Sequence, residues 1–187
     1  GVKKSLLVID LPYNTYRNKS EALKNSKKAI KETKCDAVKV EGGTRVKEIV
    51  KHLVKNKIPV LGHIGITPQT AKGKFRSKGK NESEIRKLLK DARDLEQSGA
   101  FGMVLECIYS DISKQITSAI NIPTIGIGAS VNCDGQVLVT DDLIGLNETK
   151  FRFVKKFGNI KKDIKSAVIK YKNSVKQKKF PSKKNSY

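Results

Sequence analysis

One pattern recurs along most of the chain: a short apolar run leads into a charged residue or a tight turn, and a helix-like segment follows. Five runs begin such a unit, and a sixth follows the fifth too closely for a long helix between them. The runs cover residues 6–9, 37–40, 59–62, 103–105, 123–127 and 136–139. Short buried strands that alternate with helices predict a parallel sheet with helices outside it.

The segments between these runs carry apolar residues at helical spacing. The spacing is clearest at 46–54 and at 85–95, and Gly99 stands where a helix end favours glycine. Residues 20–34 and 110–120 carry weaker versions of the pattern. The whole order is βαβαβαβαβ, which places the carboxyl ends of all the strands at one edge of the sheet.

The chain of 187 residues has a net charge of +21, and 33 of its 39 basic residues are lysine. A protein that reads nucleic acid is expected to use arginine for bidentate contacts with bases and phosphates. The lysines are instead spread along helix faces, which favours a solvated surface. Nucleic acid is therefore an unlikely partner.

The basic charge is densest at 151–187, where 13 basic residues accompany one acid, Asp163. Such a segment can dock on nucleic acid or on an anionic membrane. It also carries apolar residues at helical spacing: Ile160, Ile164, Ala167, Val168, Tyr171 and Val175. We interpret it as a packed amphipathic helix, and the chain as one domain, 1–187, that ends in this basic helical segment.

The three cysteines, Cys35, Cys107 and Cys133, are odd in number and show no CxxC spacing. This makes a disulfide framework or a zinc site unlikely and favours a reducing compartment, so we expect a cytoplasmic protein. No run reaches the roughly 20 apolar residues of a membrane-spanning helix. We therefore expect no membrane association.

Polar side chains stand at the ends of the first two predicted strands. Asp10 ends an apolar strand, where a carboxylate is costly unless it is paired or bound to a metal. Lys39 and Glu41 flank Val40, so on a strand they point to the same face. An aspartate that caps a loop and an ordinary ion pair remain the alternatives.

The next two strands carry His63 and Glu106. His63 lies between Gly62 and the pair Ile64-Gly65, where glycines let a ligand approach, and Glu106 follows an apolar run that suits a carboxylate base. A polar, lysine-rich loop at 68–81 follows the His63 strand, and a loop of this length is typically a functional lid or a disordered segment. Because strand ends converge in parallel sheets and barrels, these residues are expected to share one site with the first pair.

Several sequence blocks, taken in order, resemble the ketopantoate hydroxymethyltransferase family. They are LLVIDLPY (6–13), VKVEGG (38–43), GHIGITPQ (62–69), VLEC (104–107), IPTIGIGAS (122–130) and CDGQVLVTDDLIGL (133–146), with KKFPSKKNSY (178–187) at the end. The resemblance covers nearly the whole chain. It implies a (β/α)8 TIM barrel of the phosphoenolpyruvate/pyruvate superfamily type, with this chain carrying about strands 3–8 and the first two absent.

The resemblance also implies the reaction. A hydroxymethyl group would pass from 5,10-methylenetetrahydrofolate to 3-methyl-2-oxobutanoate and give 2-dehydropantoate, in pantothenate and coenzyme A synthesis, through a Mg²⁺-stabilised enolate. By the same resemblance Asp10 and Glu41 hold the Mg²⁺, while Asp10, Lys39 and His63 contact the substrate and Glu106 is the base. The family implies a homo-oligomer, commonly a decamer.

Two alternatives stay open at this stage. The chain can belong to the same superfamily and catalyse a lyase or mutase reaction on another 2-oxo acid. It can also be a truncated, non-catalytic remnant that binds anionic partners through its lysines. Ser130 and Tyr109 replace a glycine and a proline of the family's motifs, and the loop after Gln69 is rewritten with lysines.

Overall fold

The computed structural model of the chain describes residues 2–71, 76–148 and 151–187. The chain divides into two compact units, Gly1–Val137 and Leu138–Tyr187, which are described separately. The prediction of one domain over 1–187 stays a prediction. Within the loop predicted at 68–81, residues 72–75 lie outside the described ranges.

The first unit is built on one parallel sheet of six strands, whose order in space is their order in the sequence. The strands are β1 (Val8–Asp10), β2 (Ala37–Glu41), β3 (Val60–Gly65), β4 (Gly102–Glu106), β5 (Thr124–Ile127) and β6 (Gly135–Gln136). Every neighbouring pair is parallel, as the sequence predicts.

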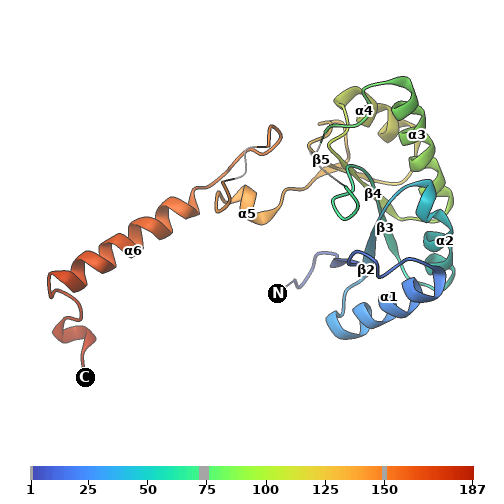
Figure 1. Ribbon diagram of the computed structural model, residues 1–187. Helices are drawn as coiled ribbons and strands as arrows, with labels where there is room; N and C mark the ends of the chain where they lie inside the picture. Colours follow the sequence, from blue (N-terminus) through green and yellow to red (C-terminus); the bar gives the residue numbers. More distant parts are fainter. Residues whose placement is uncertain (1, 72–75, 149–150) are drawn as a thin grey trace. The chain divides into compact units, whose positions relative to one another are not determined.

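Helices connect the first five strands and lie along one face of the sheet (Figure 1). They are α1 (Lys19–Thr33), the short η1 (Thr44–Val46), α2 (Lys47–Lys55), α3 (Glu82–Gln97) and α4 (Ser110–Ala119). A doubly wound sheet reverses its strand order and carries helices on both faces. Sequential order with helices on one face is instead the arrangement of a (β/α)8 barrel, so the predicted fold class is confirmed as part of such a barrel.

The helix ends follow local sequence signals. Asn18 and Asn81 precede α1 and α3, and their side chains accept hydrogen bonds from the backbone N–H groups of the first turn. Gly99, two residues after α3, has φ +89, a conformation that favours glycine. The end of α3 that the sequence predicts from Gly99 is therefore confirmed.

The core lies between the sheet and its helices. Strand residues such as Val40, Val60 and Leu105 are fully buried together with Val50 and Leu53 of α2. Because side chains alternate along a strand, the residues next to these point to the other face of the sheet. Apolar packing on one face thus directs the polar residues of β2, β3 and β4 toward the inside of the barrel.

The sixth strand is shorter than predicted. The sequence predicts a strand over 136–139, but β6 covers Gly135–Gln136, and Val137 and Val139 are exposed. β6 pairs only with β5, over two residues, and the last ladder bond runs from the Val137 N–H to the Gly126 carbonyl. The chain then leaves the sheet, so the apolar run at 137–139 is not a strand.

The second unit contains α5 (Thr140–Leu143), α6 (Ile160–Lys176) and η2 (Lys183–Asn185). The helix predicted in the basic segment is present as α6. None of its residues is buried, so the packing expected of its apolar side is not found in the part of the chain that the structure describes. Its aromatic ring contact joins Tyr171 to Phe180, edge to face, with centroids 5.5 Å apart.

Two further findings concern the cysteines and the lengths of the helices. Cys35, Cys107 and Cys133 are all buried free thiols, as their number and spacing predict. No helix in the described ranges is both long enough and apolar enough to cross a membrane.

Candidate active site

The strand register brings the predicted site residues to one edge of the sheet. Asp10 of β1 pairs with Lys39 of β2, and Glu41 of β2 pairs with His63 of β3. Glu106 ends β4 opposite Gly65 of β3. Neighbours in a parallel register point to the same side, so side chains from four consecutive strands meet above the carboxyl ends.

Lys39 joins the first strand to the third. Its Nζ lies 3.2 Å from Asp10 Oδ1 and 3.0 Å from His63 Nδ1. The Lys39 side chain is largely buried, whereas 58% of the Asp10 side chain is exposed. The ammonium is therefore a positive charge held inside the site, with one carboxylate and one imidazole as neighbours.

His63 is the centre of the cluster. Besides Lys39, its Nδ1 has Glu41 Oε1 at 3.9 Å, and its Nε2 has Glu106 Oε2 at 3.2 Å. The imidazole is almost fully buried, yet Nε2 makes no hydrogen bond in the structure. The distance to Glu106 suits a hydrogen bond, so it is the alignment of the two groups that is missing.

The Glu41 side chain is held by Gln69, a residue for which the sequence predicts no role. The Gln69 backbone N–H donates to Glu41 Oε2 at 3.0 Å, and the Gln69 side chain donates to the Leu11 carbonyl at 2.9 Å. Tyr16 donates its hydroxyl to Gln69 Oε1 at 2.6 Å. Burial, with a smaller contribution from the Glu41 charge, raises the pKa of Tyr16 above 10.0, so the hydroxyl keeps its proton and remains a donor.

Helix α3 holds the loop that follows Glu41. Asp91, which is buried, accepts the Thr44 backbone N–H at 2.8 Å, and Asp94 accepts the Thr44 hydroxyl at 2.6 Å. Hydrogen bonds from Lys90 and Thr44 lower the pKa of Asp94. A Cβ at Gly43 would lie 2.0 Å from Asp91 Cγ, so the second glycine of VKVEGG makes room for this contact.

The end of β3 lies unusually close to the end of β4. Gly65 has φ +97, and a Cβ there would lie 2.2 Å from the Glu106 carbonyl oxygen. Only glycine fits at this position without displacing β4. Cys107, next to Glu106, is not a candidate nucleophile, because burial, with a smaller contribution from the Glu106 charge, raises the pKa of its thiol to about 11.

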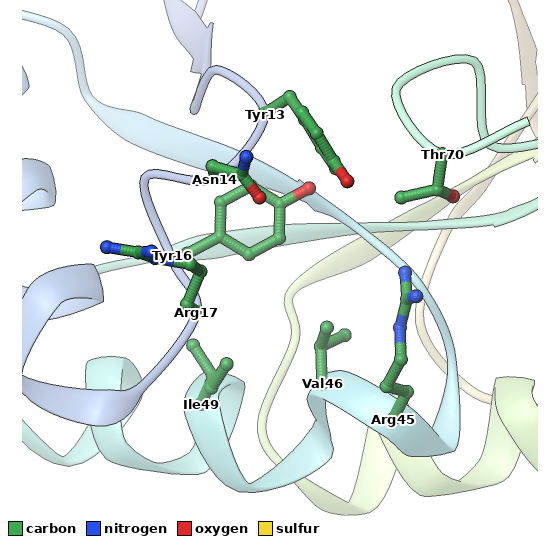
Figure 2. A pocket seen from close by; sticks show the side chains of 8 residues that line it. All are labelled: Tyr13, Asn14, Tyr16, Arg17, Arg45, Val46, Ile49 and Thr70. Atoms are coloured by element: carbon green, nitrogen blue, oxygen red, sulfur yellow. The ribbon is translucent and has the colours of Figure 1, made fainter.

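A pocket of about 260 Å³ opens beside this cluster. In Figure 2 the Tyr16 ring stands above Val46 and Ile49, and the Arg45 guanidinium points toward the same opening. The lining residues are Tyr13, Asn14, Tyr16, Arg17, Arg45, Val46, Ile49 and Thr70. A second cavity, of about 800 Å³, shares Arg45 and Thr70 with the first and is bordered by Lys78, Lys87 and Lys90.

The residues predicted to hold Mg²⁺ are Asp10 and Glu41. Among the described residues, no group of three or more His, Cys, Asp and Glu side chains is placed to hold a metal ion. Mg²⁺ is commonly bound through one or two carboxylates, with waters and ligand oxygens in the remaining positions. Two hard oxygen donors at adjacent strand ends fit that mode, since Asp10 Oδ1 contacts Lys39 and Glu41 Oε2 contacts Gln69, which leaves one oxygen of each carboxylate.

These features describe part of a (β/α)8 barrel with a carboxylate, an imidazole and a lysine amino group clustered at the carboxyl ends of its strands. The sequence profile of the family described as ketopantoate hydroxymethyltransferase matches residues 1–183. The chain belongs to this family, and it is therefore a hydroxymethyltransferase. The family name places its activity in pantothenate synthesis and favours hydroxymethyl transfer over the lyase and mutase alternatives.

The relatives carry one name, 3-methyl-2-oxobutanoate hydroxymethyltransferase. The protein from Pelagibacter ubique is 58% identical over 187 residues, which are 100% of this chain and 72% of that protein. The protein from Aliarcobacter butzleri is 44% identical, over 100% of this chain and 71% of its own length. Among solved structures, dihydrodipicolinate synthase from Acinetobacter baumannii is 15% identical over 74% of this chain and 57% of its own, with a TM-score of 0.49.

Proposed function

We propose that the protein transfers a hydroxymethyl group from 5,10-methylenetetrahydrofolate to 3-methyl-2-oxobutanoate. The methylene carbon of the folate forms a new bond to C3 of the oxo acid, water supplies the hydroxyl oxygen, and 2-dehydropantoate and tetrahydrofolate leave. The relatives' names support the substrate and the product. The observation that carries the proposal is the Glu106 carboxylate, 3.2 Å from a buried imidazole that is itself hydrogen-bonded to Lys39.

Glu106 is the base in this proposal. The C3 proton of a 2-oxo acid is only weakly acidic, so a carboxylate can remove it only if the charge that develops on the keto oxygen is stabilised. Lys39 supplies a fixed positive charge from β2, on the other side of β3, and fixed charges of this kind stabilise developing anions because they need no reorganisation. His63 lies between the two groups, and only 3% of its own side chain is exposed.

Asp10 and Glu41 would hold the Mg²⁺. When bound, the ion would contribute Lewis-acid stabilisation of charge on the oxygens of the oxo acid. Lys39, 3.2 Å from Asp10 Oδ1, orients that carboxylate. The hydrogen bond from the Gln69 N–H orients the Glu41 carboxylate in the same way.

The pocket with Tyr13, Tyr16 and Arg45 supports a folate as the one-carbon donor. A folate combines planar rings with a carboxylate tail, and this pocket combines aromatic and aliphatic walls with a guanidinium. Arg17, in the same lining, pairs with Glu21 at 2.9 Å, whereas Arg45 has no such carboxylate partner among the described residues. Tyr16 connects the pocket to Glu41 through Gln69, so a donor bound there would lie close to one of the two proposed Mg²⁺ ligands.

Three further points of the proposal follow the family. The active protein would be a homo-oligomer, commonly a decamer, which light scattering after size-exclusion chromatography measures. It would work in the cytoplasm, which the three free thiols support. Its ligands would be a small 2-oxo acid and a folate, with no role for nucleic acid.

The test is product formation by the purified protein at full length. The oxo acid and 5,10-methylenetetrahydrofolate are mixed with Mg²⁺, and 2-dehydropantoate is measured by mass spectrometry. We expect product in the complete mixture and none when the folate is omitted. A folded protein that forms no product yet binds polyanions in a salt-dependent way would favour the non-catalytic alternative.

The same assay tests the donor pocket. Arg45→Gln removes the guanidinium without a carboxylate partner, and Arg17→Gln removes the paired one, so the second variant is a matched control. We expect Arg45→Gln to raise the KM for the folate about tenfold, the scale of one charge-assisted hydrogen bond, with a smaller change for Arg17→Gln. Equal KM values in the two variants would exclude this pocket as the folate site.

A further inference from the structure

We propose that Lys39 fixes the tautomer of His63 so that the imidazole presents its Nε2–H to Glu106, which makes His63 a positioning residue for the base. The tautomer follows from the contacts around the ring. The role of Glu106 as base rests on the proposed function. The two parts can be tested separately.

The first step concerns the proton on Nδ1. An ammonium can only donate hydrogen bonds, and Lys39 Nζ lies 3.0 Å from His63 Nδ1. Nδ1 is therefore the acceptor, and a neutral imidazole then carries its proton on Nε2.

The competing partner of Nδ1 is Glu41. A carboxylate there would accept a hydrogen bond from an Nδ1–H, and the neutral ring would then present the lone pair of Nε2 to Glu106. The distance from Nδ1 to Glu41 Oε1 is 3.9 Å, too long for a hydrogen bond. The shorter contact with Lys39 decides the tautomer.

The second step concerns Nε2. This nitrogen is buried and makes no hydrogen bond, and an unsatisfied buried donor destabilises the site. Glu106 Oε2 lies 3.2 Å away. Catalytic hydrogen bonds are often poorly aligned without substrate and align in the complex, so Glu106 is the partner that this donor lacks.

As a chemical consequence, the two oxygens of Glu106 have different roles. Oε2 accepts the Nε2–H of His63, and Oε1 stays available for the proton on C3 of the substrate. His63 is held by Lys39 on one side and by its place in the middle of β3 on the other, so it is the rigid member of the pair. It would act on the reaction through the orientation of Glu106.

Nitrogen NMR of the histidine side chains tests the tautomer without any substrate. The chain has two histidines, so His52 of α2 is an internal reference. In the wild-type protein we expect an unprotonated-type signal for Nδ1 of His63 and a protonated-type signal for Nε2. A proton on Nδ1 would overturn the proposal.

Lys39→Met tests whether Lys39 determines the tautomer of His63. This variant removes the donor to Nδ1, so we expect the His63 signals to move toward the other tautomer or a mixture, while the His52 signals stay in place. An unchanged His63 spectrum in a folded Lys39→Met protein would show that Lys39 does not set the tautomer. The wild-type spectrum remains decisive if the variant does not fold.

Two substitutions of His63 separate its two nitrogens. Glutamine can place an amide N–H near the position of Nε2, and asparagine can place one near Nδ1. If His63 orients Glu106, His63→Gln keeps exchange of the substrate C3 proton about tenfold faster than His63→Asn, the scale of one hydrogen bond to a charged group. Equal rates, or a faster His63→Asn, would contradict the positioning role.

The two failures can be told apart. If the wild-type protein does not exchange the C3 proton at all, the proposed function fails, and the ring spectrum still decides the tautomer. If exchange occurs but the ring carries its proton on Nδ1, only the present inference fails.

Discussion

The polar residues of the sheet occupy two different settings. Glu41, at the end of β2, and His63, within β3, expose 5% and 3% of their side chains, and each is contacted from two sides. At the end of β1, Asp10 exposes 58% and pairs with Lys39. The two residues proposed for Mg²⁺ thus lie in different settings: Glu41 is in the buried middle of the sheet beside His63, and Asp10 is exposed at the edge of the described sheet.

The difference follows from the position of the strands. β3 has a neighbouring strand on each side, whereas β1 is the first strand in the order and pairs with β2 alone within the described sheet. A residue on a central strand receives contacts from two neighbours and a fixed register. Asp10 has one such neighbour, so its geometry depends on Lys39 far more than that of His63 does.

The largest effect is expected at Lys39, which contacts both the exposed Asp10 and the buried His63. Lys39→Met removes the charge that contacts both Asp10 and His63, and the loss of one group that stabilises a developing oxyanion lowers kcat by about 10²–10³. Steady-state kinetics measure this. Lys47→Met, which removes a half-exposed lysine 3.8 Å from Asp94, is the control and should keep its activity. Equal activities would contradict a role for Lys39 in the site.

Gly65→Ala disturbs the buried middle through the backbone. The added Cβ would lie 2.2 Å from the Glu106 carbonyl oxygen at a residue with φ +97, so we expect a loss of about 2–3 kcal/mol in the free energy of unfolding. Urea unfolding measures it. Gly135→Ala on β6 is the matched control, since its Cβ would meet nothing closer than 3.9 Å. If the two variants are equally stable, β3 and β4 do not approach as described.

Asp10→Asn tests the open edge. The variant keeps the shape of the side chain and removes its charge, so we expect Mg²⁺ to bind about tenfold more weakly, with little change in stability because the residue is exposed. Titration calorimetry with Mg²⁺ alone gives the affinity. Asp111→Asn, on α4, should bind Mg²⁺ as the wild type does. Unchanged affinity in Asp10→Asn would remove Asp10 from the metal site.

The smallest effect is expected at the opposite edge, between β5 and β6. Hydrogen bonds from the Thr124 backbone N–H and hydroxyl lower the pKa of Asp134 below 3.8. In acid the unfolded chain binds more protons at this group than the folded chain does, so its contribution is present above pH 3.8 and is lost as the pH falls through the lowered pKa. Asp134→Asn should flatten the acid dependence of unfolding measured by circular dichroism. A slope equal to that of the wild type would contradict the lowered pKa.

The sequence predicts well which residues meet in the buried middle of the sheet, because two simple rules determine their positions. Apolar runs at strand length give a parallel sheet, and parallel strands share one edge for their carboxyl ends. Lys39, Glu41, His63 and Glu106 therefore meet as expected, although their chemical roles remain predictions. The end of α3, two residues before Gly99, was predictable from the glycine itself.

The contacts that fix these residues were not predictable. Tyr16 and Gln69 lie 53 residues apart, and Gln69 sits in a loop with no periodicity. Asp91 lies on a lysine-rich helix, where an aspartate looks like one half of a surface ion pair, and only the fold brings it to Thr44. Gln69 ends the GHIGITPQ block and Gly43 ends VKVEGG, so both residues stand in recognisable motifs. The motifs alone do not say which residues they contact.

The run at 136–139 and the helix α6 show the limits of periodicity. A pattern predicts the local structure that a segment favours, but it does not supply the partner that buries it. After the bond from the Val137 N–H to the Gly126 carbonyl, the apolar run makes no further ladder bond to β5 in the described part of the chain. α6 forms as its spacing predicts, and its apolar residues remain exposed in the part of the chain that the structure describes.

The most direct test of the account follows the C3 proton of 3-methyl-2-oxobutanoate by proton NMR in D₂O, with Mg²⁺ and without folate. We predict exchange with the wild-type protein at full length, slowed about 10²–10⁴-fold in Glu106→Gln, the usual loss when a general base is removed. A Glu106→Gln protein that exchanges the proton at the wild-type rate would contradict the central claim that Glu106 is the base.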